Sequence, residues 1–430
     1  MRAAASGVNL SPTGAFGQQR ARLARPSAET WMSAQPGNSP SPRQRLAILR
    51  RRRDEKMARS VHAYVRGSTV QFYDWLRETH RRRLPEGPSV WICGDCHVGN
   101  LGPIADCGGA IDIQIRDLDQ TVIGNPAHDL IRLGLSLAAV ARGADLPGVT
   151  TAHMLEEMIR GYEEALADDR GAPEPDAVKI VRKQAVGRKW RHLVKERLAD
   201  LKPSIPLGSH FWALSDEERQ AVETLFQAPA ARKLVTSLSS RDDDAPVELL
   251  DAAYWIKGCS SLGLLRVAVL LGVGDLDPRN GGFCLIDIKE AGEAAAPAAP
   301  DRRMPRDDAR RVVQGARRLS PNLGDRMVAA RLLGRPAVLR ELLPQDLKIE
   351  IGQFGRAEAM RSARYLASVV GAAHARQMSR SDRRAWGLEL GRHHAANLDA
   401  PSWLWSSVVE LAARHEAGYL EHCRRYALAA

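Results

Sequence analysis

The stretch that decides the fold is CGDCHVGN, residues 93–100, because three different chemistries compete for it. As Cys-x-x-Cys-His it has the form of a c-type haem attachment site, and as Cys-x-x-Cys it has the form of a redox or zinc motif. As Asp-x-x-x-x-Asn it places a base, Asp95, and a metal ligand, Asn100, at the separation used in the catalytic loops of phosphotransferases. The rest of the sequence is needed to choose among these three interpretations.

Length and charge set the outer limits. The chain has 430 residues, enough for two or three domains or for one large two-lobed unit. Its 62 basic and 51 acidic residues give a net charge of +11. This balance favours anionic ligands such as phosphates or nucleic acid, but it does not choose between them. An Arg-rich proteome explains the same excess equally well.

The first part of the chain and its cysteines bear on the compartment. Residues 1–42 are rich in Ser, Pro, Gly, Gln and Arg, lack the apolar core of a secretory signal, and predict a disordered arm. No run approaches about 18 apolar residues, so we expect no membrane span. We expect a cytoplasmic protein, in which the six Cys stay reduced. This weakens the haem interpretation, since c-type haem is normally attached outside the cytosol.

Apolar periodicity, together with Gly, Pro and Asn signals, predicts the secondary structure. In chain order, the predicted elements are two helices within 43–83, a strand over 89–93, a hairpin of strands 101–104 and 110–116, a helix starting at Asn125, mainly helical chain over 150–230, strands within 254–273 and 282–288, a helix over 306–319, a hairpin of strands 327–333 and 337–343, and helices from 356 onward. Helical and β-rich blocks therefore alternate along the chain.

The phosphotransferase interpretation makes specific demands. Phosphoryl transfer needs a carboxylate near the acceptor hydroxyl, ligands that hold Mg²⁺ on the phosphates, and a cation that positions them. Asp95 and Asn100 lie on a loop after a strand, and Asp117 follows the next hairpin, which can bring it back beside Asn100. Because Mg²⁺ prefers oxygen ligands, Asn100 and Asp117 are predicted to hold the metal while Asp95 faces the acceptor.

Three motifs carry a family resemblance. GDCHVGN, residues 94–100, resembles the catalytic loop of aminoglycoside and choline kinases, whose pattern is His-Gly-Asp-x-His-x-x-Asn. DLD, residues 117–119, resembles their metal-binding Asp-Phe-Gly/Asp segment, and GNPAHDL, residues 124–130, resembles their Gly-Asp-Pro-x-x-Asp-Leu helix start. The chain is also similar, over most of residues 45–380, to the bacterial family called domain of unknown function 2252, which brings no assigned substrate.

The match to the kinases departs at two positions. Cys93 stands where the kinase pattern has a His that braces the loop, and Asp119 stands where Gly is usual. Neither departure removes a catalytic group. The resemblance implies Asp119 as a second metal ligand, and loop or phosphate support from Arg66, His97 and Asp129.

A nucleotide site is implied further along the chain. GCSSLG, residues 258–263, is similar to the Gly-rich loop that covers nucleotide phosphates, although an ordinary hairpin turn explains it nearly as well. IDIK, residues 286–289, resembles the Val-Ala-Ile-Lys strand whose Lys holds phosphates, and ELLPQ, residues 341–345, would border the adenine of ATP. The nucleotide-binding residues so implied are Gly258, Ser260, Ser261, Gly263, Lys289 and Glu341.

These parts stand in an unusual order. Kinases run from the Gly-rich loop through the Lys to the catalytic loop, whereas here the catalytic loop comes first. We therefore expect an α+β, two-lobed, protein-kinase-like fold that is circularly permuted, as folded domains with neighbouring termini tolerate. Residues 43–245 would form the catalytic-loop part of a large, mainly helical lobe, 250–345 the small β-rich lobe, and 350–430 the helices that complete the large lobe. Independent domains with chance matches are the competing account.

One kinase part is missing. The helix over 306–319 stands where a Glu should pair with Lys289, yet it carries no Glu, and Gln314 is the nearest candidate. Glu290 is adjacent to the Lys and points to the other face of a strand. We expect an ATP- and Mg²⁺-dependent phosphotransferase that acts on a hydroxyl-bearing small molecule or protein. A nucleotide-binding pseudokinase and an AMP transferase remain as alternatives.

The cysteines allow a competing site. Cys93, Cys96, His97 and Cys107 could supply zinc ligands. If Asp95 serves a catalytic loop, however, Cys93 and Cys96 are better interpreted as small packing residues. Their position on either side of Asp95 also suggests that oxidation to a disulfide could disable the loop.

The basic stretch over 179–197, which includes Trp190, could form a nucleic-acid-binding face. A solvated helix surface is the favoured interpretation.

Overall fold

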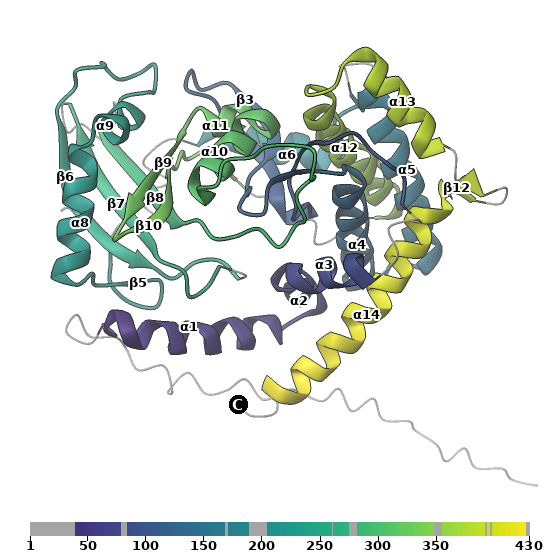
Figure 1. The fold of residues 1–430 in the computed structure, drawn as a ribbon, viewed down its shortest axis with the longest axis horizontal. Helices are drawn as coiled ribbons and strands as arrows, with labels where there is room; N and C mark the ends of the chain where they lie inside the picture. The colour runs from purple at the N-terminus through teal and green to yellow at the C-terminus, as the bar shows by residue number, and fades with distance from the viewer. Residues whose placement is uncertain are drawn as a thin grey trace, which may run out of the picture.

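The structure is a computed structural model that describes residues 39–78, 84–167, 171–188, 204–259, 261–274, 282–347, 355–391, 394–395 and 398–426. Most of the arm predicted over residues 1–42 lies outside these ranges. Helix α1 (Pro42–Met57) begins at the residue where the arm was expected to end. The described chain divides into a helical part and a β-rich part, which lie side by side in Figure 1.

The helical part combines helices with short antiparallel strand pairs. Its helices are α2 (Val61–Gly67), α3 (Thr69–Glu78), α4 (Ala127–Gly143), α5 (Gly148–Ala167), α6 (Asp176–Gly187), α12 (Arg356–Ala375), α13 (Arg380–Gly391) and α14 (Ser402–Tyr426). Its antiparallel strand pairs are β1 (Val90–Ile92) with β4 (Val122–Gly124), β2 (Leu101–Ala105) with β3 (Ile111–Ile115), and β11 (His394–Ala395) with β12 (Leu398–Pro401). The short helix η3 (Val98–Asn100) joins β1 to β2 through the loop over 93–100.

The β-rich part is one antiparallel sheet of six strands. In spatial order these are β5 (Phe211–Trp212), β6 (Val247–Trp255), β7 (Arg266–Val273), β8 (Phe283–Glu290), β10 (Arg335–Glu341) and β9 (Met327–Leu332). Its helices are α8 (Asp216–Gln227), α9 (Pro229–Val235), α10 (Asp308–Leu319) and α11 (Pro321–Gly324). In Figure 1, α8 and α9 cover the outer face of the sheet, and α10 and α11 lie between the sheet and the helical part.

Side-chain alternation along β8 shows how the sheet is placed. Cys284, Ile286 and Ile288 join the apolar core beneath α8 and α9. Leu285 belongs to a separate cluster on the opposite face. Because successive side chains of a strand point to opposite faces, Asp287 and Lys289 share the face of Leu285. That face is turned toward the helical part.

The predicted elements are confirmed in type at most positions. Both predicted hairpins form, with β2 paired to β3 and β9 paired to β10. The helix pair expected within 43–83 is three helices, because the chain breaks at Ser68 between α2 and α3. The β-rich part also begins earlier than residue 250, since β5 pairs with β6, and α8 and α9 pack on the sheet.

The long helices α5 and α12 pack closely because Gly161 of α5 and Gly371 of α12 lie in their contact. A Cβ atom on Gly161 would lie 2.0 Å from the backbone oxygen of Arg364, so any larger residue would push the helices apart. Their contact brings Tyr162 of α5 to His374 of α12, with 2.9 Å between the hydroxyl and Nδ1. His374 in turn lies against Asp129 at the start of α4. This packing sets the position of the loop over residues 93–100.

Helix α1 bridges the two parts, as Figure 1 shows along the lower edge of the molecule. Near its first turn, the buried Arg45 forms an ion pair with Glu218 of α8 at 2.6 Å. Near its last turn, Lys56 donates a hydrogen bond to the Gly258 oxygen at 2.7 Å. Just beyond the helix, the Ala58 oxygen accepts a hydrogen bond from Tyr419 of α14 at 3.2 Å. One helix is therefore anchored on both sides of the molecule.

None of the helices among the described residues combines the length and apolar character needed to cross a membrane. The basic stretch predicted over 179–197 is described only up to residue 188, where α6 carries its first part. Its remainder lies outside the described residues.

His415 on α14 gives the helical part a pH-dependent stability. Its side chain is 1% exposed, its Nδ1 lies 2.9 Å from the Leu411 oxygen, and its Nε2 has no partner among the described residues. Burial, assisted by the charge of Arg132, lowers the pKa of His415 to about 4. The unfolded chain therefore binds the proton more tightly than the folded one, and stability present above pH ~6.5 is lost as the pH falls toward 4.

We expect wild-type protein to lose about 2 kcal/mol more unfolding free energy than His415→Gln between pH 7 and pH 5. Urea denaturation of both proteins at the two pH values measures this difference. Comparing the two proteins removes the contributions of other titrating groups, which they share. Equal pH dependence in both would contradict the assignment of the effect to His415.

Candidate active site

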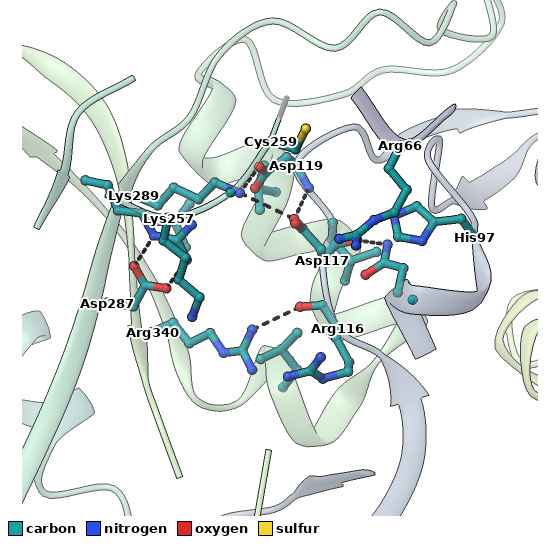
Figure 2. A pocket seen from close by; sticks show the side chains of 18 of the residues that line it. Arg66, His97, Arg116, Asp117, Asp119, Lys257, Cys259, Asp287, Lys289 and Arg340 are labelled. Carbon is teal, nitrogen blue, oxygen red and sulfur yellow. Dashed lines mark hydrogen bonds and ion pairs between the residues drawn. The ribbon is translucent and has the colours of Figure 1, made fainter. Parts of the chain in front are cut away.

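A cavity of about 250 Å³ lies between the helical and β-rich parts. The loop over 93–100 and the end of β3 line it on one side, and β7, β8 and β10 line it on the other (Figure 2). Among the described residues, seven Lys and Arg side chains and three Asp side chains contribute to its walls. This excess of positive charge favours a ligand with several negative charges.

Asp129 holds the loop over 93–100 in place. Its buried carboxylate accepts hydrogen bonds from the backbone N–H of Cys93 at 2.7 Å and of Gly94 at 2.9 Å, and it contacts His374 Nε2 at 3.2 Å. Gly94 has a φ of 75°, and a Cβ atom there would lie 2.1 Å from the Gln120 oxygen, so only glycine fits. Asp129, predicted to support the loop, thus lies where it can fix the loop backbone.

Asn100 connects the loop to the end of the β2–β3 hairpin. Its Nδ2 donates to the backbone oxygen of Asp117 at 2.7 Å and to that of Asp95 at 3.3 Å. These acceptors fix the amide orientation, because a carbonyl oxygen can pair only with the nitrogen. No described residue donates to Oδ1 of Asn100, which leaves this oxygen available as a ligand on the cavity wall.

The predicted metal and phosphate residues meet in the cavity. Lys289 of β8 forms an ion pair with Asp119 and lies 3.5 Å from Asp117 Oδ1, although 170 residues separate it from Asp119 along the chain. The backbone N–H of Asp119 also faces Asp117 Oδ1 at 3.4 Å. Figure 2 shows the Lys289 amine reaching between the two carboxylates. Residues chosen from two distant motifs therefore form one cluster.

The carboxylates of Asp117 and Asp119 differ in pKa. Desolvation raises the pKa of Asp117, but Lys289 and Arg266 outweigh it and hold that pKa well below its ordinary value. This desolvation acts although 58% of the Asp117 side chain is exposed, because the side chain lies in the cavity between the two parts of the protein. For Asp119, burial and the neighbouring charge of Asp117 prevail and raise the pKa to about 6. Burial lowers the pKa of Lys289, but the attraction of both carboxylates raises it further.

Asp95, the predicted base, lies beside the cavity and is not among its lining residues. Its side chain is 16% exposed, and its Oδ1 accepts a hydrogen bond from Arg132 Nε at 2.9 Å. Arg132 is buried and also donates to the Val65 oxygen. Sequence reasoning missed Arg132. Its signal was its position three residues after Asp129 on α4, since such helix neighbours share one face.

The Gly-rich turn between β6 and β7 is only partly in the cavity. Gly258 and Gly263 both have a φ of 107°, which requires glycine. Gly258 lines the cavity, whereas Ser261 and Gly263 do not. Ser260 lies outside the described residues. Of the implied phosphate-covering residues, the structure therefore brings Gly258 to the site.

Glu341 occupies a different place from the one predicted. Its side chain is fully buried, forms an ion pair with Arg241 at 2.9 Å, and does not line the cavity. Burial raises its pKa despite the nearby Arg241 and Arg326. The Glu341 carboxylate therefore belongs to an internal ion pair of the β-rich part, and the structure does not bring it to the nucleotide site that the sequence implied.

Several cavity residues were not predicted from the sequence. Asp287 accepts two hydrogen bonds from Arg266, one at 2.8 Å from Nε. Burial raises the pKa of Asp287, but Arg266 prevails and lowers it to about 2. Its signal was the two-residue spacing from Lys289 on one strand, which places both on one face. Arg116 and Arg340 also line the cavity, joined by a 2.9 Å hydrogen bond from Arg340 to the Arg116 oxygen.

The cysteines are not gathered into a metal centre. Cys93 and Cys96 are free and buried, and burial raises the pKa of the Cys93 thiol well above its ordinary value. Among the described residues, no group of three or more His, Cys, Asp and Glu side chains is arranged to hold a metal ion. Zinc coordination by Cys93, Cys96, His97 and Cys107 therefore has no support in the described geometry.

Fold and site together define a mixed α/β protein with a cationic cavity between a sheet and a helical part. Residues 45–425 match the family described as "Uncharacterized protein conserved in bacteria", domain of unknown function 2252. The chain belongs to this family, as its motifs predicted. Comparison with curated proteins and with solved structures gave no match.

Proposed function

We propose that the protein is an ATP- and Mg²⁺-dependent phosphotransferase that acts on a hydroxyl-bearing acceptor. The observation that carries the proposal is the meeting of Lys289 with Asp117 and Asp119 in one cationic cavity. Phosphoryl transfer depends mainly on positioning and charge stabilisation, and this cluster supplies both signs of charge at one point.

The residues present fit magnesium and a nucleotide. The Asn100 Oδ1 and the carboxylates of Asp117 and Asp119 would hold Mg²⁺, which neutralises phosphate charge when bound. Such sites commonly use one or two carboxylates and leave the remaining positions to water and substrate phosphates, so this small oxygen set suffices. Lys289, paired with both carboxylates in the structure, would contact phosphate when nucleotide is present.

The order of parts in the sheet supports a kinase-like fold. In protein kinases the Gly-rich loop precedes the third strand, which carries the Lys, and a helix with the Lys-pairing Glu follows. Here a Gly-rich turn joins β6 to β7, Lys289 lies on β8, and α10 follows. The β9–β10 hairpin then completes the sheet beside β8.

Circular permutation is supported by one contact. In the usual kinase order, a helix leads directly into the catalytic loop. Here Gln377, two residues after α12, pairs with the backbone of Trp91 in β1 at 2.9 Å and 3.0 Å. The end of α12 thus lies at the strand that enters the loop, although it comes 286 residues later in the chain. A chain that joined these two points would have the usual order.

Asp119 lies where it can partly take the place of the Glu that pairs with the Lys in kinases. Helix α10 carries Arg311, whose guanidinium donates to the backbone oxygens of Asp119 at 3.1 Å and Gly292 at 2.7 Å. The helix therefore fixes the Asp119 segment directly, and Asp119 pairs with Lys289. In our proposal Asp119 partly replaces the absent Glu by holding the Lys in the cavity.

The position of Asp95 suits a carboxylate that orients the acceptor hydroxyl and accepts its proton. Its ion pair with Arg132 fixes the orientation of its carboxylate. In the loose transition state of phosphoryl transfer little proton abstraction is needed early, so an oriented carboxylate that accepts the acceptor proton is adequate. Asp95 would therefore align the hydroxyl and receive its proton as transfer proceeds.

The test uses full-length protein, Mg²⁺ and ATP labelled at either the γ or the α position, with a panel of hydroxyl-bearing compounds and with water as acceptor. We expect label from γ in the product and none from α. Label from α would instead indicate an AMP transferase. Nucleotide binding that requires Lys289 but yields neither product would favour a pseudokinase, and absence of nucleotide binding would refute the proposal.

A further inference from the structure

The cations that line the cavity differ in how they are neutralised. Arg266 is paired with Asp287, Lys289 with Asp117 and Asp119. Arg340 is paired with Asp346 at 3.1 Å. Arg66 and Arg116 have no carboxylate within ion-pair distance among the described residues, although both line the cavity. A desolvated guanidinium without a counter-ion is costly unless a ligand supplies one.

Arg66 lies against the loop over 93–100. Its guanidinium makes no hydrogen bond with any described residue, and its Nε is buried without a partner. A Cβ atom on Gly99 would lie 3.7 Å from the Arg66 guanidinium carbon, which shows how closely the side chain approaches the loop. The backbone oxygen of the preceding residue, Val65, accepts a hydrogen bond from Nη2 of Arg132, whose Nε donates to Asp95. Arg66 is therefore on the same side of the cavity as the proposed base.

Arg116 precedes the metal-binding Asp117. Its Nη2 donates to the Asp346 backbone oxygen at 2.9 Å, while its Nε is buried without a partner. Burial, assisted by the charge of Arg340, lowers the pKa of Arg116 to about 10, so the side chain is still charged at neutral pH. Two guanidinium groups that form no ion pair with a described carboxylate thus line the cavity from the helical part.

A third polar group accompanies the two arginines. His97 lines the cavity beside Arg66, and its Nδ1 is buried without a partner. Burial and the charge of Arg66 lower the pKa of His97 well below its ordinary value, so the ring is neutral. Figure 2 shows Arg66 and His97 together on the side of the cavity opposite Lys289. A neutral ring and two guanidiniums match the hydrogen-bonding needs of a phosphate group.

We propose that Arg66 and Arg116 bind a phosphate monoester on the acceptor, so that the substrate is a phosphorylated alcohol. This inference rests on the proposed phosphotransferase function and adds its substrate class. A phosphate dianion matches two guanidinium charges, whereas a carboxylate would neutralise one. The placement separates the two ligands: Lys289 and Gly258 serve the nucleotide from the β-rich part, and Arg66 and Arg116 serve the acceptor beside the Asp95 loop.

The test is isothermal titration of inorganic phosphate into the full-length protein saturated with Mg²⁺ and a non-hydrolysable ATP analogue. We expect phosphate to bind this complex, and Arg66→Met or Arg116→Met to weaken phosphate binding by about tenfold or more, since a charge-assisted hydrogen bond is lost. The same variants should change the affinity for the ATP analogue less than about threefold, and Arg66→Lys should restore part of the phosphate affinity.

Two controls make the result specific. Lys289→Met should weaken the binding of the ATP analogue and leave the binding of phosphate nearly unchanged. Arg50→Met removes an exposed positive charge of α1 outside the cavity and should change neither affinity. Competition between phosphate and the analogue, or phosphate affinity that is insensitive to Arg66 and Arg116, would overturn the inference while leaving the phosphotransferase proposal standing. Failure of the analogue to bind would refute both.

Discussion

Replacing Asp117 with Asn should lower ATP-dependent turnover by roughly 10³-fold or more. Asp117 is the carboxylate whose pKa is held low by Lys289 and Arg266, so it is ionised throughout the neutral range. The amide keeps the shape of the side chain and removes the charge that would hold Mg²⁺. Release of γ-label from ATP, with water or a phosphorylated alcohol as acceptor, measures the loss.

Asp112→Asn is the matched control for this variant. Asp112 lies on the same hairpin, is exposed, and does not line the cavity. It should retain at least about half of the wild-type rate, because surface substitutions away from a site have small effects. Turnover that persists in Asp117→Asn at near wild-type rate would show that the assigned metal site is wrong.

The second large effect concerns stability. Replacing Asp129 with Ala should lower the unfolding free energy by about 3–5 kcal/mol. The change leaves the backbone N–H groups of Cys93 and Gly94 without their buried acceptor and removes the partner of His374 Nε2. Chemical denaturation followed by tryptophan fluorescence measures the loss.

Two further variants serve as controls for this measurement. Asp129→Asn keeps one oxygen acceptor and should lose less stability than Asp129→Ala, so it remains measurable if the Ala variant does not fold. Asp74→Asn removes a partly exposed carboxylate of α3 whose ion-pair partner among the described residues is Arg77, three residues later, and it should change stability by less than about 0.5 kcal/mol. A loss below about 1 kcal/mol in Asp129→Ala would contradict the role assigned to this buried network.

Local features of the fold were predictable because they depend on local chemistry. Turn residues and strand periodicity predicted the β2–β3 and β9–β10 hairpins, and both form. The break at Ser68 was missed, because α2 and α3 carry apolar residues at a spacing that also fits one continuous helix. The early start of the β-rich part was missed for another reason: β5 has only two residues, too few for a periodic signal.

The site was predictable where a motif fixes a role and not where tertiary packing does. Asn100, Asp117, Asp119 and Lys289 were chosen from three separate motifs, and the structure brings all four to one cavity. The ion pair between Asp95 and Arg132 depends on how α4 packs beneath the loop. The spacing of Arg132 from Asp129 places both on one helix face, but it does not specify that Arg132 pairs with Asp95. The same limit applies to Glu341, whose burial beside Arg241 follows from the packing of the sheet.

Helix α1 has a mechanical consequence for the cavity. Two-lobed proteins commonly open by rotation about one connection, with a few hinge residues absorbing the change. Here the Arg45–Glu218 pair and the Lys56–Gly258 hydrogen bond hold α1 on the β-rich part, while the backbone after the helix is bound to α14. Simple rotation about the chain connections would stretch one of these attachments. Widening of the cavity must therefore either carry α1 along as part of the rotating body or detach it, which makes the N-terminal helix a mechanical coupling between the two parts.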